Sequence, residues 1–585
     1  MIKGYAKEIF HLLGKDAVKL PILLFMFLGM SILDVIGLGL IAPYVAMILD
    51  PNLVNSDLYA VLTKFFAEPL DSEFIIYIAS AILFLIFFIK SIVVIFINYY
   101  ITKFSQDQQV RLRSTLMRIY QNLPYLIYLK RSGGEYVYNI YNLVGQFSNG
   151  VVLSGLRAVS DIIVAIMVFG FLAWSNIFAF ILLVFMLSLS LYIYDNAFKN
   201  KLSRSGKITN TASSKLSQNV HEGIDGFKEI RILGVENFFR KKVVSAAKKI
   251  RDNQIIYHLI LTLPRYILEL VLVGFIVLFV VGSYFFDVNT VNLTSTLVLY
   301  GVASVRLMPI FNSFSSTINQ LRFNRDTVSK LYYDLSYLKK YDYNSSKPLV
   351  KLINSLEQEG FQSIKLNNVT FSYPETDKKI LDNVSIEIKK NKIIGIVGQS
   401  GTGKSTLMNI ILGLLPLSNG DVKYNDKNIQ ECLSYFQSKI AYMPQDIYII
   451  DDSIKNNIAL GVPENEIDRD RLNDSINSAQ LTDFVNNSPF GIETKLGTKG
   501  VKISGGQKQR IALGRVFYHQ RDIIFMDEST SSLDNETEKE ISDEIEKYKG
   551  EKTFVIISHR LPILKHCDLI YQLDHNGNIM ITNFK

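Results

Sequence analysis

A glycine-rich segment gives the strongest chemical signal in this chain. Residues 398–405 read Gly-Gln-Ser-Gly-Thr-Gly-Lys-Ser, between an apolar run at 393–397 and a helical pattern at 406–415. The glycines let backbone N–H groups turn inward around phosphate oxygens, and the helix that follows adds the positive end of its dipole. This strand–loop–helix context predicts a phosphate-binding loop for a nucleoside triphosphate with Mg²⁺. The predicted phosphate contacts are Gly398, Ser400, Gly401, Gly403, Lys404, Ser405 and Thr406, with the Ser405 hydroxyl also placed for Mg²⁺.

A second apolar run, at 523–526, ends in the acidic pair Asp527 and Glu528. An acid at the carboxyl end of a parallel strand lies where open α/β sheets bind their ligands. We expect Asp527 to hold Mg²⁺, through water, and Glu528 to accept a proton from the attacking water as general base. Acidic pairs at strand ends are common on protein surfaces, so this assignment depends on the phosphate loop in the same chain.

A Ser-Gly-Gly-Gln turn at 504–507 opens a further helical pattern and offers a second cradle of N–H groups. One nucleotide would then have two phosphate-binding helix termini in a single chain. The simplest solution is a head-to-tail pair of chains, in which each turn covers the γ-phosphate bound by the other chain. The residues assigned to this cradle are Ser504, Gly505, Gly506 and Gln507.

The elements that position these residues fall into two halves. The chain has 585 residues, and 49% of them are hydrophobic. This length is too great for one domain of roughly 100–200 residues. Residues 1–330 are expected to form an all-α membrane domain, 331–360 a polar linker, and 361–585 an α/β domain of alternating short strands and helices. Apolar stretches long enough to cross a bilayer of ~30 Å lie at about 20–48, 74–101, 150–173, 176–195, 256–284 and 293–315.

Charge in the loops predicts the orientation of these spans. Loop 50–73 holds one basic residue against five acidic ones, whereas loop 195–254 holds thirteen Lys or Arg. The positive-inside rule therefore places both termini and the α/β domain in the cytoplasm of a multi-pass protein. The net charge of +8 follows from this topology and does not indicate a nucleic-acid partner. Segment 53–67 has one apolar face, which predicts an external helix lying on the membrane or packed on the bundle.

The second half resembles the nucleotide-binding domain of ATP-binding cassette (ABC) transporters, and the whole chain resembles a half-transporter of the exporter type. The resemblance implies an ATP hydrolase coupled to transport, with ATP and Mg²⁺ as ligands and a homodimer with two working sites. It assigns adenine stacking to Tyr373, and to Gln445 the link between Mg²⁺, the attacking water and the membrane domain. His559 matches the residue that senses the γ-phosphate, and 531–534 match the loop that crosses between partners. Ile503 replaces the usual leucine, and Thr498 a common glutamate.

Two short motifs in the last two spans narrow the resemblance. Pro-Arg-Tyr-Ile-Leu-Glu at 264–269 and Val-Arg-Leu-Met-Pro at 305–309 are similar to the bacterial lipid-linked oligosaccharide flippase family (PglK-type). This similarity implies a translocase of a polyprenyl-pyrophosphate glycan, used in glycosylation, in the inner membrane. Asn312 and Ser313 stand where that family tends to carry a further cation. A multidrug, lipid or peptide exporter is the alternative.

Charged residues inside the predicted spans are costly, at about 2.5–3.5 kcal/mol each on insertion scales, so each must face a partner or water. Glu269 follows Arg265 by four residues, which predicts an ion pair on one helix face. Lys90 and Arg306 have no such neighbour in sequence. They are candidate cavity cations for a pyrophosphate, with interhelical pairing (Asp161 is one possible partner) or snorkelling as the other interpretation.

Overall fold

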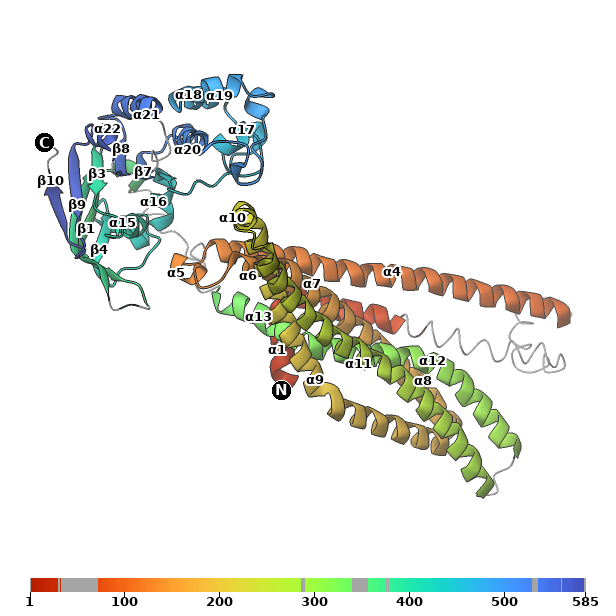
Figure 1. Cartoon of the computed structure of the whole chain (residues 1–585). Coiled ribbons are helices and arrows are strands. Elements are labelled where there is room, and N and C mark those ends of the chain that lie inside the picture. Colours follow the sequence, from red (N-terminus) through yellow and green to blue (C-terminus); the bar gives the residue numbers. More distant parts are fainter. Residues whose placement is uncertain are drawn as a thin grey trace. The chain divides into compact units, whose positions relative to one another are not determined.

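The computed structural model of the chain forms two compact units. It describes residues 2–29, 32, 72–285, 290–338, 356–374, 376, 378–528, 535–558 and 560–582. The first unit comprises Met1–Leu123 and Ile127–Tyr343, and the second comprises Pro124–Leu126 and Asn344–Lys585 (Figure 1). The chain therefore passes between the units near residue 125 as well as after Tyr343.

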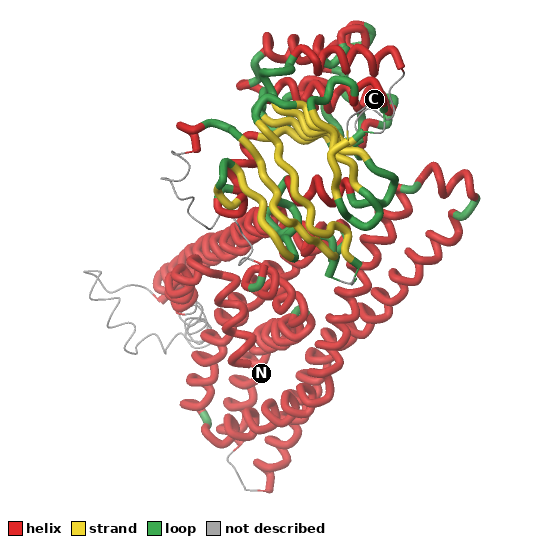
Figure 2. Tube along the Cα trace, turned by 90° about the vertical axis from the view of Figure 1, so that its left-hand side faces the viewer, coloured by secondary structure: helices red, strands yellow, loops and turns green. Residues whose placement is uncertain are grey.

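The first unit is built of helices, and the strands are confined to the second unit (Figure 2). Three of the described helices have 49 or 50 residues, which at 1.5 Å per residue gives about 75 Å, far more than a bilayer core. The α-helices are α1 (Ile2–Leu13), α4 (Ser72–Gln121), α5 (Tyr125–Tyr128), α6 (Gly133–Tyr138), α7 (Val144–Phe147), α8 (Ser154–Ser175), α9 (Ile177–Asp225), α10 (Phe227–Leu233), α11 (Glu236–Phe285), α12 (Thr290–Phe323) and α13 (Arg325–Ser336). Two π-helical turns, η3 (Asn139–Leu143) and η4 (Ser148–Leu153), join α6 to α8.

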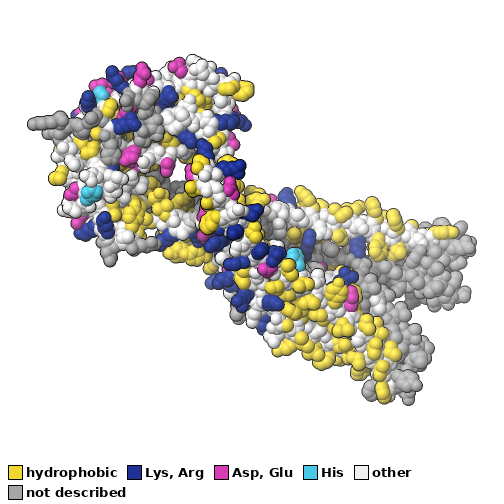
Figure 3. Space-filling view, in the orientation of Figure 1, with side chains coloured by type: hydrophobic (Ala, Val, Ile, Leu, Met, Phe, Trp, Pro, Cys, Tyr) yellow, Lys and Arg dark blue, Asp and Glu magenta, His cyan; other side chains and the backbone are white. Residues whose placement is uncertain are grey.

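Among the described residues, four helical segments are long and apolar enough to cross a membrane: Ser80–Gln121, Gly133–Trp174, Ile177–Asp225 and Glu236–Gly282. Hydrophobic side chains cover much of the surface of the helical unit, and Lys and Arg side chains gather toward one end (Figure 3). An apolar outer surface is expected of helices that face lipid. The predicted span 293–315 lies within α12. Most of the predicted span 20–48 and all of the predicted external helix 53–67 lie outside the described residues.

Helix α13 extends past residue 331, where a polar composition predicts the start of a linker. Leu331 is fully buried, and Asp334 is only 2% exposed. Asp326 and Asp334 of this helix accept hydrogen bonds from other helical segments of the first unit. The start of the predicted linker is therefore a buried helix, because its polar side chains have partners inside the unit.

The second unit contains two sheets, as expected of an α/β domain. Six described strands form a mainly parallel sheet in the order β10-β9-β3-β8-β7-β6, and four form an antiparallel sheet in the order β2-β1-β4-β5. The strands are β1 (Ser363–Ser372), β2 (Lys379–Lys389), β3 (Ile393–Val397), β4 (Asn419–Tyr424), β5 (Lys427–Asn428), β6 (Ile440–Met443), β7 (Ile523–Asp527), β8 (Thr553–Ile557), β9 (Leu569–Leu573) and β10 (Ile579–Thr582). The helices are α15 (Lys404–Ile411), α16 (Leu433–Lys439), α17 (Ile454–Ile458), α18 (Arg469–Ser478), α19 (Thr482–Asn486), α20 (Gly505–His519), α21 (Asn535–Lys547) and α22 (Leu561–Leu564).

The central strands are buried on both faces, which explains their continuous apolar sequences. Every residue of β7 and β8 is buried, and the two strands pair in parallel with Asp527 opposite Ile557. Their shared carboxyl edge is where the predicted acids emerge. Tyr125 and Leu126, which belong to this unit, pack against its hydrophobic core, a cluster that includes Phe436 and Phe525.

We predict that Gly206→Ala destabilises the first unit. Gly206 is buried in α9, and a Cβ atom there would lie 1.8 Å from the carbonyl oxygen of Phe323 at the end of α12. Overpacking of this kind costs about 1–3 kcal/mol, so the apparent melting temperature of the full-length protein in detergent should fall. Gly155→Ala in α8 is the control, because no described atom lies within 4 Å of its added Cβ. Equal melting temperatures for the two variants would contradict the close contact of α9 and α12.

Candidate nucleotide and catalytic site

The predicted phosphate loop joins the buried strand β3 to helix α15, which begins at Lys404. Gly401 and Gly403 have φ angles of +80° and +101°, a region that favours glycine. The Lys404 ammonium donates hydrogen bonds of 2.9 Å to the carbonyl oxygens of both Gly398 and Gln399. Burial lowers the pKa of Lys404, whereas the nearby Glu528 and Asp527 act to raise it. The side chain is thus held within the loop, where phosphate oxygens can replace the carbonyls as acceptors.

The start of the phosphate loop is packed tightly against the end of strand β9. A Cβ atom on Gly398 would lie 2.6 Å from the carbonyl oxygen of Leu573 and 2.9 Å from Thr402 Oγ1, so glycine is required there by space. In the turn after β9, His575 Nε2 lies 2.6 Å from Gln399 Oε1. His575 was not predicted, because no motif connects two residues that lie so far apart in sequence.

Asp527 ends strand β7 beside the loop, with a side chain that is 5% exposed. Burial raises the pKa of this carboxyl group, and Glu528 adds to that effect, whereas the Ser405 hydroxyl and Lys404 oppose it. Ser405 hydrogen-bonds the Asp527 carboxylate, yet Asp527 Oδ1 is buried without a hydrogen-bond partner among the described residues. A buried oxygen that lacks a donor, beside a hydroxyl group, fits the oxygen ligands that Mg²⁺ prefers.

Glu528 has a φ angle of +46°, in the left-handed region that non-glycine residues rarely adopt. Its N–H donates to the carbonyl oxygen of Ile557 at 3.0 Å. Gln445, in the loop after β6, donates from Nε2 to Glu528 Oε2 at 2.9 Å. One of these hydrogen bonds holds the strained backbone and the other holds the carboxylate of the same residue. The structure therefore brings Gln445 and Glu528 into direct contact.

Tyr373 follows strand β1 and contacts the phosphate-loop helix through its hydroxyl group. Its Oη atom lies 3.3 Å from Thr406 Oγ1, and its ring meets that of Phe371 edge-on at 5.0 Å. This links the predicted adenine-stacking side chain to the first turn of α15.

The predicted Ser-Gly-Gly-Gln cradle forms the N-terminus of α20. Ser504 Oγ accepts from the N–H of Gln507 at 3.2 Å, and Gln507 Oε1 accepts from the N–H of Ser504 at 2.8 Å. This reciprocal capping fixes the turn, and the first N–H groups of a helix have no partner within the helix. Ser504 and Gly505 are exposed, as expected of a surface that meets a ligand on another molecule. His559 and residues 531–534 lie outside the described residues.

Comparison with known families identifies the class of protein. The family described as ABC transporter transmembrane region matches residues 24–320, and the family described as ABC transporter matches residues 381–531. This chain belongs to the ABC transporter family. It is a half-transporter with the ABC exporter fold, and its ABC domain binds ATP and couples ATP hydrolysis to transport across a membrane that the chain crosses several times. A half-transporter fold implies dimerisation.

The similarity to individual proteins is distant. The chain is 26% identical over 494 residues to an ATP-dependent lipid A-core flippase of Pseudomonas fluorescens, which covers 82% of this chain and 77% of that protein. It is 24% identical over 482 residues to the flippase of the same name in Shigella sonnei, covering 81% and 80%. A solved structure of a bacterial Atm1-family ABC exporter with ATP bound matches with a TM-score of 0.72 and 18% identity, covering 97% of this chain and 94% of that one. The fold class predicted from sequence is confirmed.

We predict that Glu528→Gln abolishes turnover and leaves ATP binding intact. The amide cannot accept the proton of the attacking water, and loss of a general base typically costs about 10²–10⁴-fold in rate. Phosphate release and fluorescent-nucleotide binding, measured on the full-length protein, separate the two effects. Glu466→Gln, at an exposed site in the same unit, is the matched control. Brisk hydrolysis by the Glu528 variant would show that the base lies elsewhere.

Proposed function

We propose that this exporter is a flippase that moves an amphipathic lipid with a pyrophosphate-bearing headgroup, a polyprenyl-linked oligosaccharide, across the bacterial inner membrane. The presence of Lys90 and Arg306 inside predicted spans carries this proposal. Cations at such depth are retained where they face an anion or water. Relatives that bear the name of a lipid A-core flippase support a lipid as the cargo.

The contacts of the other intramembrane charges support this assignment. Arg265 Nε lies 3.2 Å from Glu269 Oε1, so the ion pair predicted from their spacing is confirmed and each of these two charges has a partner on its own helix. The side chain of Lys90 is 9% exposed, and its ammonium lies 5.2 Å from the ring centroid of Phe87. Burial at this level of α4 places the charge away from the lipid-facing surface. The side chain of Arg306, on α12, lies outside the described residues.

One observation favours the alternative, a multidrug exporter that takes cations. Asp161 on α8 hydrogen-bonds Ser313 on α12, and Asp161 Oδ2 is buried without a hydrogen-bond partner among the described residues. A carboxylate oxygen in this position would suit an amine. Ser313 stands where the related flippases tend to carry a cation, so the headgroup site of this chain would differ from theirs at that level.

We further propose that Ser405, Gln445 and Asp527 hold Mg²⁺ at the nucleotide site. The ion, when bound, would neutralise charge on the transferred phosphoryl oxygens. The chain's own residues bind the nucleotide and accept the proton. Lys404 contacts the β and γ phosphates, Glu528 takes the proton of the attacking water, and His559 contacts the γ-phosphate. Tyr373 stacks on adenine, and residues 504–507 of a second chain cover the γ-phosphate.

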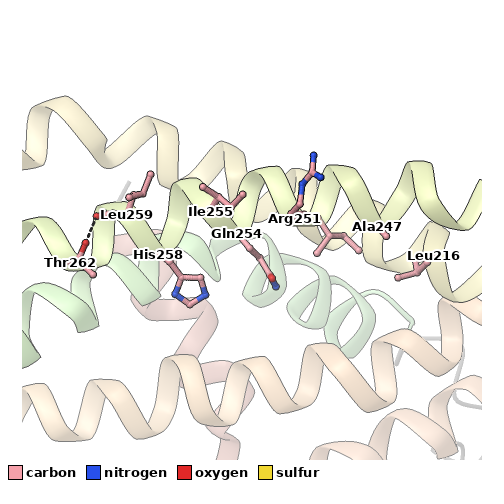
Figure 4. Close-up of a pocket in the computed structure, with 9 residues that line it drawn as sticks. Leu216, Ala247, Arg251, Gln254, Ile255, His258, Leu259 and Thr262 are labelled. Carbon is pink, nitrogen blue, oxygen red and sulfur yellow. Dashed lines mark hydrogen bonds between the residues drawn. The ribbon is translucent and has the colours of Figure 1, made fainter.

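The working form is proposed to be a homodimer that joins both halves of two chains. The tip formed by α10 exposes large apolar side chains, with Ile232 at 85% exposure and Phe227 at 69%. A groove of about 630 Å³ also runs along α11 (Figure 4). Large exposed apolar surfaces usually mark sites that another molecule covers. The groove is lined by Leu216 of α9 and by Ala247, Ile250, Arg251, Gln254, Ile255, His258, Leu259 and Thr262 of α11.

We predict that Lys90→Ala and Arg306→Ala each reduce the flux of a fluorescent pyrophosphate-linked lipid in proteoliposomes. Loss of a hydrogen bond to a charged group costs about 1.5–3 kcal/mol, or roughly 10–100-fold. Basal ATP hydrolysis should persist, because neither residue lies in the nucleotide-binding unit. The double variant Arg265→Gln with Glu269→Gln is the control, since it removes an ion pair that needs no ligand. Unchanged lipid flux in both single variants, or stimulation of the ATPase by cationic drugs alone, would favour the multidrug alternative.

A further inference from the structure

We infer that Asp334 is a positioning residue for the coupling of ATP hydrolysis to transport. Its carboxylate joins the two places where the chain passes between the units, so that they move as one body within the first unit. This inference depends on the exporter class of the protein and does not depend on which substrate it carries.

Asp334 lies on α13 and receives hydrogen bonds from three separate segments. Arg131 binds it in a bidentate manner, at 3.0 Å from Nη1 to Oδ2 and 2.9 Å from Nη2 to Oδ1. Asn139 Nδ2 donates to Oδ2 at 3.2 Å, and the Tyr120 hydroxyl donates to the same oxygen. Asn139 Nδ2 also lies 3.3 Å from the Tyr120 hydroxyl. One carboxylate thus ties the end of α4, the segment after α5 and the start of η3 to α13.

Aromatic side chains extend this cluster to helix α5. The Tyr136 hydroxyl donates to the carbonyl oxygen of Tyr128, the last residue of α5, at 3.1 Å. The rings of Tyr128 and Tyr136 stack with their centroids 5.4 Å apart, and Tyr120 meets Tyr136 edge-on at 4.7 Å. The segment that immediately follows Pro124–Leu126 is therefore fixed to the same cluster as Asp334.

The position of this cluster in the sequence gives it a mechanical consequence. Pro124–Leu126 belongs to the nucleotide-binding unit, and the chain returns to the helical unit at Ile127, shortly before Arg131. Asp334 shortly precedes Tyr343, the last residue of the helical unit. Both routes by which the chain reaches the nucleotide-binding unit thus start from one buried carboxylate. A displacement delivered along either route reaches α13 directly.

Further polar contacts fix α13 to the other helices of this unit. Asn210 of α9 donates from Nδ2 to Asp326 Oδ2 and to Thr327 Oγ1, both at 3.0 Å. Arg325 binds Glu8 of α1 at 3.0 Å. Asn324 alone separates α12 from α13, so a displacement of α13 is passed to α12, the helix that contains the predicted span 293–315.

Hydrogen–deuterium exchange on the full-length protein in lipid nanodiscs, with and without ATP and Mg²⁺, tests this inference. Peptides from α15 report nucleotide binding, and peptides from α12 report the response of the membrane domain. In the wild type we expect ATP to alter exchange in both. Coupling between sites typically corresponds to a factor of about 5–150, and we expect Asp334→Asn to reduce the α12 response about tenfold while α15 keeps its protection.

The double variant Arg131→Gln with Asp334→Asn separates positioning from folding. It leaves no buried unpaired charge, so it should fold even where Asp334→Asn does not, and it should still lose the α12 response. Lys330→Gln removes an ion pair that lies within α13, to Asp326 at 3.2 Å, and serves as the control that keeps the response. A wild-type amplitude at α12 in the double variant, or an α12 that does not respond to ATP in the wild type, would overturn the inference.

Discussion

The hydrocarbon core of a bilayer solvates neither charges nor unpaired backbone groups, so a chain that crosses it must satisfy both inside its own helices. This constraint separates the chemistry of the protein into two parts. The triphosphate and its hydrolysis are handled by an α/β unit whose buried strands aim their carboxyl ends at one edge. The helical unit satisfies charged groups with partners of its own: Arg265 pairs with Glu269 within a predicted span, and Arg131 pairs with Asp334 where the helices run beyond the spans. Helices of 49 or 50 residues are long enough to do both, because only about 20 residues are needed to cross the core.

Within the nucleotide-binding unit, opposite charges are buried close together before any ligand arrives. Burial lowers the pKa of Lys404 and raises that of Asp527, so each group is under-solvated in its charged form. The anionic phosphates of ATP would stabilise the charged form of Lys404, and the proposed cation would do the same for Asp527. The left-handed backbone at Glu528, which costs about 1–3 kcal/mol, is retained at the same edge. The hydrogen bonds to Ile557 and Gln445 help to compensate this strain.

More of the second unit than of the first could be predicted from the sequence. The strands beginning at residues 393 and 523 could be predicted because a buried parallel strand has a continuous apolar sequence, and the acids Asp527 and Glu528 lie where the second of these strands ends. Two contacts at the site differ in how far they could be predicted from the sequence. One is the contact of Gln399 with His575, and the other is the reciprocal capping of Ser504 and Gln507. The capping involves residues only three positions apart in sequence, whereas the histidine contact depends on tertiary packing that no local pattern records. Asp334 was hidden for a related reason: in a segment rich in Lys, Tyr and Asp, composition indicates solvent, and only the fold shows that three other segments supply its donors.

Burying a carboxylate with an arginine partner between helices costs desolvation free energy. Removing two charges from water costs several kcal/mol per ion, and well-packed apolar residues of the same volume often give equal or greater stability. Stability alone therefore does not explain why Asp334, Arg131, Tyr120 and Asn139 meet inside the helical unit. Hydrogen bonds differ from apolar contacts in that they lose their energy steeply with distance and angle. A cluster of them keeps the segments that it joins in one fixed arrangement, where an apolar contact would let them slide. That is the property required at the point where the chain's two connections to the ATP-hydrolysing unit meet, because a connection that slides would dissipate the motion it should deliver to α12.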